Sequence, residues 1–124
     1  MLKKTMMFKI RSRIHVVPIG EILYLEKYRK QIRAHTEKGD HVFYARFDDV
    51  MPDLDVRFSR CHRSYVLNYD RVVYMGDYVI RMDDSSELFF GKPTILRIKK
   101  DYESYMEWKR KKLREIDLKT GYFR

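Results

Sequence analysis

Short segments that alternate between apolar and polar residues follow one another along most of this chain. Phe8 and Ile10 flank Lys9, and Ile32 and Ala34 flank Arg33. Because successive side chains of a strand point to opposite faces, this alternation predicts half-buried β-strands. Segments rich in β-branched and aromatic residues predict further strands at 14–16, 22–25, 42–46, 72–75, 78–82 and 87–90.

Compact turn sequences separate these segments. Glu37–Asp40, Gly76–Asp77 and Asp83–Ser86 combine Gly, Asp and Ser, which are typical of hairpin connections. Because strand follows strand, antiparallel pairing and an all-β core are favoured over a doubly wound fold. At 124 residues, the chain is expected to form a single domain.

Two helices are predicted. Phe47, Val50 and Leu54 recur at helical spacing and indicate a short helix with Asp48 as its N-cap. A longer basic helix is predicted from Pro93 to Glu115, roughly 35 Å long. It either packs one face on the domain and solvates the other, or projects past the sheets with a partner surface of its own. Its apolar stripe consists of Ile95, Ile98, Tyr102, Tyr105, Leu113 and Ile116.

The charge balance restricts the class of partner. The chain carries 27 Lys and Arg against 18 Asp and Glu, a net charge of +9. This excess suits a nucleic acid or an anionic lipid surface, and acidic proteins remain further candidates. The single Cys61 excludes an internal disulfide, and neither a leader sequence nor an apolar run of about 18 residues is found. We therefore expect a cytoplasmic protein without a membrane span.

Residues suited to binding are concentrated in the run FSRCHRSYVLN at 58–68. Its segment Arg60–Ser64 is expected to form a recognition loop, anchored by apolar residues on both sides. Arg63 is the candidate base reader, because a guanidinium bonds guanine O6 and N7 together, for roughly 1–3 kcal/mol of discrimination. The alternative is a surface arginine paired with a carboxylate. His62 is interpreted as a packed ring bonded to backbone, and Asn68 as an amide that closes a turn. Ser64 either touches phosphate or caps the loop.

Two other segments present cations. Tyr28, Arg29 and Lys30 fall at a predicted hairpin tip, where they either reach a groove or phosphate or are simply solvated. Gly91–Thr94 joins the last strand to the long helix. The first N–H groups of that helix favour a phosphate, and Lys92 adds a charge.

Catalysis is not expected. The sequence has no Gly-rich phosphate loop, and its four histidines show no metal-ligand spacing. Cys61 and His62 are neighbours between strand-forming residues, so their side chains point to opposite faces and are badly placed to share a proton. We therefore expect no cofactor, no metal and no small-molecule substrate.

The run at 58–68 resembles the Phe-x-Arg-x-His-Arg-Ser-Tyr-x-x-Asn pattern of LytTR-type DNA-binding domains. Further resemblance covers the opening strand at 17–26, the strand, turn and strand at 35–44, the short helix at 47–54, and the last strand and basic helix at 89–100. It implies an elongated stack of small antiparallel β-sheets, like a β-sandwich, with a short helix and a longer C-terminal helix. We predict an N-terminal extension at 1–6, the LytTR-like domain at 7–105 and a basic helical tail at 106–124.

The resemblance also implies a function. LytTR domains are mostly effector parts of bacterial response regulators in two-component systems, and they place loops in successive major grooves of direct-repeat promoter sites. Carried over to this chain, the contacts with double-stranded DNA come from Arg29 and Lys30, from Arg63, and from Lys92. No receiver segment precedes the pattern, so the chain is expected to be either a stand-alone regulator or the excised end of a longer protein.

The third loop departs from the family pattern. Pro93 stands where relatives often carry a basic side chain, so Lys92 or Arg97 is the simplest substitute contact. Lys99 is predicted to bind phosphate whatever the DNA sequence.

Two other functions compete with DNA binding. The long helix is a candidate protein-interaction or homodimerisation module through Tyr102, Tyr105, Met106 and Trp108. Its basic cluster at 109–112 is a weaker candidate for an anionic membrane surface, so no membrane partner is expected.

Overall fold

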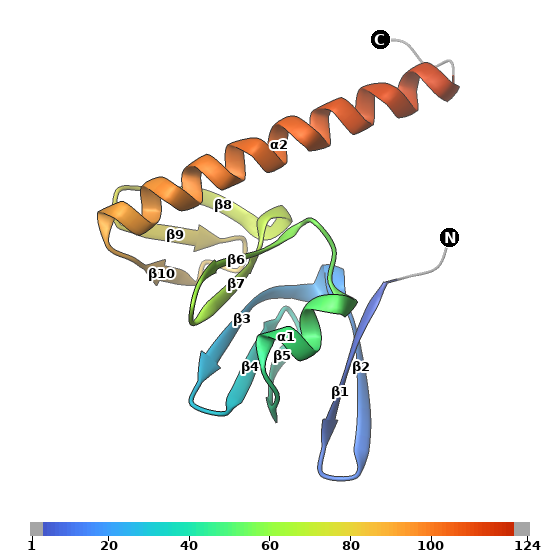
Figure 1. Ribbon diagram of the computed structural model, residues 1–124, viewed down its shortest axis with the longest axis vertical. Helices are drawn as coiled ribbons and strands as arrows, with labels where there is room; N and C mark the ends of the chain where they lie inside the picture. The colour runs from blue at the N-terminus through green and yellow to red at the C-terminus, as the bar shows by residue number, and fades with distance from the viewer. Residues whose placement is uncertain (1–3, 121–124) are drawn as a thin grey trace.

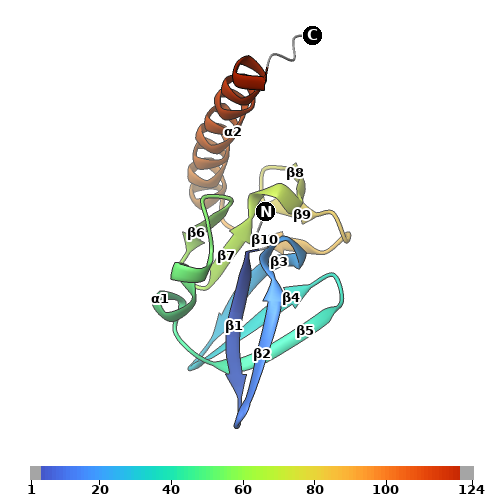
Figure 2. The same cartoon turned by 90° about the vertical axis from the view of Figure 1, so that its right-hand side faces the viewer.

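The computed structural model describes residues 4–120. In this part of the chain ten strands form three antiparallel sheets, with a short helix near the middle and a long helix at the end (Figures 1 and 2). The predicted mainly β architecture is confirmed. Residues 1–3 of the predicted extension and 121–124 of the predicted tail lie outside the described residues.

A five-stranded sheet with the order β5-β4-β3-β7-β6 forms the centre of the domain. Glu26 near the end of β3 lies opposite Tyr65 at the start of β7. The β3–β4 turn and the β6–β7 turn therefore leave the sheet at the same end. The strands are β3 (Ile22–Tyr28), β4 (Gln31–Thr36), β5 (Gly39–Tyr44), β6 (Phe58–His62) and β7 (Tyr65–Asn68).

A two-stranded sheet of β1 (Thr5–Ile10) and β2 (Arg13–Pro18) covers one side of this centre. The Phe8 ring of β1 stacks on Phe43 of β5 with 4.3 Å between ring centroids. Both side chains belong to the first hydrophobic core, which also takes in residues of β3, β4 and the short helix. Three-residue 3-10 turns flank the sheet strands as η1 (Ile19–Glu21), η2 (Met51–Asp53) and η3 (Tyr69–Arg71).

The short helix differs from its prediction at both ends. Helix α1 spans Phe47–Val50, and its N-cap is Arg46 instead of Asp48. The Asp49 carboxylate accepts the Arg46 backbone N–H at 2.8 Å, which closes the first turn. Pro52 has no N–H to continue the α-helical pattern, so the chain tightens into η2 after Val50.

A three-stranded sheet and the long helix enclose a second core. The sheet has the order β10-β9-β8, with β8 (Val72–Met75), β9 (Val79–Met82) and β10 (Glu87–Phe89). Helix α2 spans Lys92–Thr120, beginning one residue before and ending five residues after the prediction. Its Ile95 and Ile98 are buried together with Ile80 and Met82 of β9.

The two halves of α2 have different surroundings. Tyr102 and Tyr105 pack against Tyr69 of η3, with ring centroids 5.3 and 5.7 Å apart. Beyond Lys109 the helix projects past the sheets (Figures 1 and 2), and Leu113 and Ile116 are 54% and 53% exposed. The predicted apolar stripe therefore contacts the domain only as far as Tyr105. Each of the two predicted arrangements describes one half of the helix.

Candidate nucleic-acid interface

The run at 58–68 forms a tight hairpin, and of the loop expected at 60–64 only Arg63 and Ser64 lie outside the strands. Strands β6 and β7 pair, His62 lies opposite Tyr65, and Arg63 and Ser64 form the two-residue turn. The His62 Nδ1 accepts the Ser64 backbone N–H at 3.0 Å. The Ser64 carbonyl accepts the Lys27 backbone N–H from β3 at 2.8 Å. Both sides of the turn are therefore fixed by hydrogen bonds.

Packing on both sides anchors this hairpin. The Phe90 ring contacts the rings of His62 and Tyr65, with centroids 5.6 and 5.4 Å apart. Phe58 is buried, and Asn68 accepts the Asp70 backbone N–H and donates to the Ile22 carbonyl. The interpretations of His62 as a packed ring and of Asn68 as a turn-closing amide are confirmed.

Cys61 is part of the same anchor. Burial raises the pKa of its thiol to about 12, so the thiolate is scarce at neutral pH. A buried thiol of this kind is a poor nucleophile. The Cys61 carbonyl accepts a hydrogen bond from the Arg97 Nη2 of α2 at 3.0 Å, which ties the helix to the hairpin.

The turn residue Arg63 is exposed. Among residues 4–120, no ion pair joins Arg29, Lys30, Arg63 or Lys92 to a carboxylate. The alternative that Arg63 is a surface arginine paired with a carboxylate thus finds no support in the described part of the chain. A guanidinium without an internal partner is available for an anion or a base edge.

The β3–β4 turn is the predicted hairpin tip. Tyr28 lies opposite Gln31, so Arg29 and Lys30 form a two-residue turn. Arg29 has φ of 57°, the left-handed conformation that usually requires Gly. Its guanidinium lies over the Tyr28 ring, 5.4 Å from the centroid. All three side chains of the tip are exposed.

The start of α2 lies on the same side of the molecule as the two hairpin turns (Figure 1). Phe90, which packs under the β6–β7 turn, leads directly into Gly91 and the exposed Lys92. The Ile95 N–H donates to the Gly91 carbonyl, so the helical turn begins at this point. The β3–β4 turn with Arg29 and Lys30, the β6–β7 turn with Arg63, and the first residue of α2, Lys92, are therefore on one side of the molecule.

The two predicted contacts farther along α2 are separated. Arg97 lines a groove beside β6, together with Arg63 and Ser59. Lys99, two residues later, lines a different hollow beside β8 with Tyr102. Residues two positions apart on an α-helix point about 200° away from each other, so the two side chains occupy different faces of α2.

Sequence reasoning missed Asp101, which occupies the same groove as Arg97. Its carboxylate accepts the hydroxyls of Ser59 and Tyr69 at 2.7 and 2.6 Å. Burial and this carboxylate raise the Tyr69 pKa far above its usual value. Asp101 is 42 residues from Ser59 and 32 residues from Tyr69 along the chain, and no local pattern marks such contacts.

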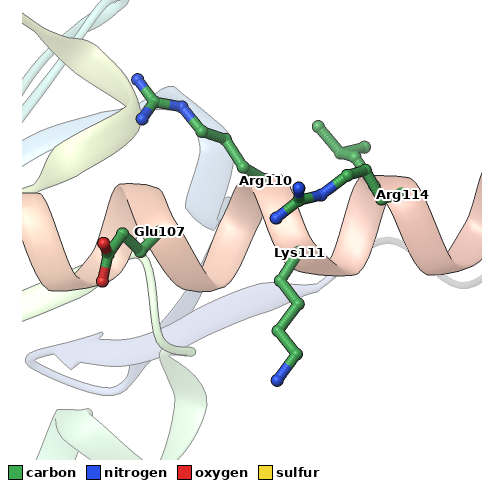
Figure 3. Close-up of a pocket in the computed structure, with 5 residues that line it drawn as sticks. Glu107, Arg110, Lys111 and Arg114 are labelled. Carbon is green, nitrogen blue, oxygen red and sulfur yellow. The ribbon is translucent and has the colours of Figure 1, made fainter.

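Other features give no sign of a second kind of site. A hollow of about 690 Å³ along the far half of α2 is open, and Arg110, Lys111 and Glu107 point away from one another (Figure 3). Within residues 4–120 there is no group of three or more His, Cys, Asp or Glu side chains arranged to hold a metal. No helix in this range is long and apolar enough to cross a membrane.

The fold and site therefore define a small multi-sheet β domain that presents cationic turns on one side. Comparison with known families matches residues 12–103, more than half of the chain, to the LytTr DNA-binding domain. The chain belongs to this LytTR family. The family is a class of DNA-binding domain, not a class of enzyme.

Individual relatives agree with this assignment. The transcriptional regulatory protein YpdB of Escherichia coli is 28% identical over 79 residues, which cover 59% of this chain and 32% of YpdB. The Shigella flexneri YpdB gives the same values. The chain therefore spans about a third of the length of the curated relatives it matches. A solved Bacillus cereus structure, a LytTr DNA-binding domain described as part of a methyl-accepting/DNA response regulator, superposes with a TM-score of 0.66 at 19% identity, covering 80% of this chain and 96% of that one.

Proposed function

We propose that this chain binds double-stranded DNA sequence-specifically and regulates transcription in the bacterial cytoplasm, as the effector part of a response regulator or as a stand-alone regulator. Family membership supports DNA binding. The observation that carries the proposal is the gathering of Arg29, Lys30, Arg63 and Lys92 on one side, without carboxylate partners among residues 4–120. Unpaired cations gathered on one face are the electrostatic footprint of a nucleic-acid interface.

The three loops have different roles in this proposal. The β3–β4 and β6–β7 turns leave adjacent strands, which are separated by only about 5 Å in a sheet. The two turns therefore reach neighbouring base pairs. Lys92 lies beyond a different sheet, and it contacts the next groove of a direct-repeat site.

In this proposal, the basic side chains of the three loops divide between base reading and contact with the DNA backbone. Arg63 reads a base through its guanidinium fork, and Ser64 lies beside it. Arg29, Lys30 and Lys92 neutralise phosphates, and Tyr28 supplies the surface over which Arg29 lies. Lys99 adds a phosphate contact that does not depend on sequence.

Selection of bound sites from randomised duplexes, followed by affinity measurements at several salt concentrations, tests this proposal. The log of the binding constant should fall with the log of salt concentration by about 0.9 for each phosphate neutralised. A flat dependence, or failure to enrich any sequence, would contradict DNA binding by this surface.

Part of the surface proposed for a protein-interaction helix is occupied by contacts with the domain itself. Tyr102 and Tyr105 pack on the domain, and the Tyr105 hydroxyl donates to Asp70 at 2.6 Å. Lys109 of the basic cluster also pairs with Asp70, at 2.9 Å. Trp108, 43% exposed, remains as a contact for a homodimer on DNA. Sedimentation of wild type and Trp108→Ala, with and without the selected duplex, tests this arrangement. If the two proteins have the same mass when free and form complexes of the same mass with the duplex, Trp108 does not mediate a homodimer.

A further inference from the structure

A groove of about 400 Å³ lies between the β6–β7 hairpin and the first turns of α2. Three arginines, one histidine and one aspartate line it, so it carries a net positive charge when the histidine is neutral. Its charged and polar lining consists of Ser59, Arg60, His62, Arg63, Arg97 and Asp101.

The partners of these side chains show which of them are available. Arg60 is occupied by the Asp48 carboxylate at 2.6 Å, and its guanidinium lies over the Phe47 ring. Arg97 donates one hydrogen bond from Nη2 to the Cys61 carbonyl. Because a guanidinium has five N–H donors, others remain for a ligand. Asp101 is bonded to the Ser59 and Tyr69 hydroxyls.

The hydrogen bond to His62 fixes its tautomer. Because Nδ1 accepts the Ser64 N–H, a neutral His62 ring carries its proton on Nε2. One edge of the ring therefore holds the turn, while the opposite nitrogen is a donor. His62 and Arg97 together bring N–H donors to a single groove.

We propose that this groove binds one phosphate of the DNA backbone through the Arg97 guanidinium and the His62 Nε2–H, and thereby seats Arg63 against the bases. The ligand is an anion, because the free groups are donors and the net charge of the groove is positive. Asp101 also lines the groove, and its negative charge disfavours an anion close to its carboxylate. The inference rests on the proposed function and names the atoms of DNA that this site takes.

Single phosphates of the selected duplex, replaced one at a time by uncharged methylphosphonates, provide the test with the full chain. Among the positions at which the replacement weakens wild-type binding, one should be the phosphate held in this groove, with a loss of about tenfold. Arg97→Ala should weaken binding to the unmodified duplex by a similar factor, and the modification at that position should then cost no more than about twofold. Lys99→Ala, on another face of α2, should keep the full sensitivity of the wild type at that phosphate.

A pair of His62 variants separates holding the turn from binding phosphate. His62→Asn places an amide near Nδ1 and retains an acceptor for Ser64, but it removes the Nε2 donor. His62→Gln places its amide near Nε2 instead. We expect the Asn variant to keep the circular dichroism spectrum and melting temperature of the wild type while losing sensitivity at the same phosphate. The Gln variant should lower the melting temperature and retain that sensitivity.

Three outcomes would overturn the inference. The first is that Arg97→Ala and His62→Asn both retain the wild-type sensitivity at every phosphate. The second is that both variants bind the unmodified duplex as tightly as the wild type. Inorganic phosphate, titrated into the free protein, could bind this groove with micromolar affinity while DNA binding stays independent of Arg97, which would make a free anion the ligand. If instead the wild type binds no duplex, the proposed function itself fails.

Discussion

The two hairpin turns that leave the same end of the central sheet are held in different ways. The β6–β7 turn is fixed by the Ser64 N–H bond to His62, the Lys27 N–H bond to Ser64 and the Arg97 bond to Cys61. The β3–β4 turn is closed by its own strand pairing and places Arg29 in a left-handed conformation. One turn is braced by distant parts of the chain, and the other contains local strain.

This difference suits the two turns to different contacts with DNA. A braced side chain pays less conformational entropy when it binds, so Arg63 is suited to a contact that depends on geometry. Arg29 and Lys30 extend from a less supported tip, and a phosphate contact tolerates such freedom because its attraction is less directional. We therefore expect base preference to follow the β6–β7 turn and salt dependence to follow both turns.

Arg63→Ala should have the largest effect on recognition. It should cost about 1–3 kcal/mol on the selected site and abolish the preference at one base pair. Fluorescence anisotropy with single-base variants of the site measures this loss. Arg11→Ala is a matched control, because Arg11 lies at the β1–β2 turn of a different sheet and should leave base preference unchanged. Equal losses on selected and random DNA would remove Arg63 as a base reader.

Arg29→Gly should separate strain from charge. Glycine adopts positive φ without a steric cost, so the free energy of unfolding should rise by about 1 kcal/mol, while DNA affinity falls and the salt dependence becomes shallower. Urea unfolding and salt titrations measure the two effects. Arg11 has φ of 59°, against 57° for Arg29, so Arg11→Gly should give the same stabilisation without loss of DNA affinity. A loss of stability in both variants would mean that the left-handed turns are not strained.

Thiol labelling of Cys61 should report how firmly the β6–β7 hairpin is held. Because burial raises the thiol pKa to about 12, a disulfide reagent should react only when the hairpin opens. Removing the bond from Arg97, worth about 1 kcal/mol, should raise the labelling rate of the Arg97→Ala variant about fivefold. An unchanged rate would show that Arg97 does not brace the hairpin.

The same raised pKa gives a direction for the pH dependence. The unfolded thiol ionises near its ordinary pKa of 9.0, well before the folded thiol. The contribution of the protonated Cys61 thiol to the free energy of unfolding is therefore complete below pH 9 and is lost as the pH rises toward 12. Cys61→Ser should lose less stability than wild type between pH 8 and pH 10, because its hydroxyl does not ionise there.

Ser64→Ala should have the smallest effect. The bonds of this residue that hold the turn use its backbone N–H and carbonyl, which alanine retains. We expect a change in unfolding free energy within about 0.5 kcal/mol. DNA affinity should change little as well, unless the hydroxyl contacts phosphate, in which case the loss should disappear in a duplex with the corresponding methylphosphonate.

Local sequence patterns predicted much of this domain, and the failures share a cause. Alternation and β-branched or aromatic composition together located eight of the strand segments, and the two-residue tip at Arg29 and Lys30 followed from its position between strands. The segment 60–64 was expected as a loop because its polar residues lie between apolar anchors, whereas the structure confines the turn to Arg63 and Ser64. Its shape depends on Lys27 and Phe90, which lie in other strands or connections.

Long-range partners also explain what was missed on α2. The periodicity of the helix placed Leu113 and Ile116 on the same apolar stripe as Ile95, but periodicity does not reveal where the surface beneath a helix ends. Asp101 looked like an ordinary polar position, although it joins Ser59 to Tyr69. The cations of the interface were recognisable from the family pattern, while their freedom from carboxylates required the three-dimensional structure.

Amide hydrogen exchange of the full chain, free and bound to its selected duplex, tests the central claim most directly. We expect added protection at the turns 29–30 and 63–64 and at the start of α2 near Lys92, with no change in the exposed helix at 110–118. Protection confined to that far half of α2, or to the outer face of the β8–β10 sheet, would contradict a DNA interface built from the three loops.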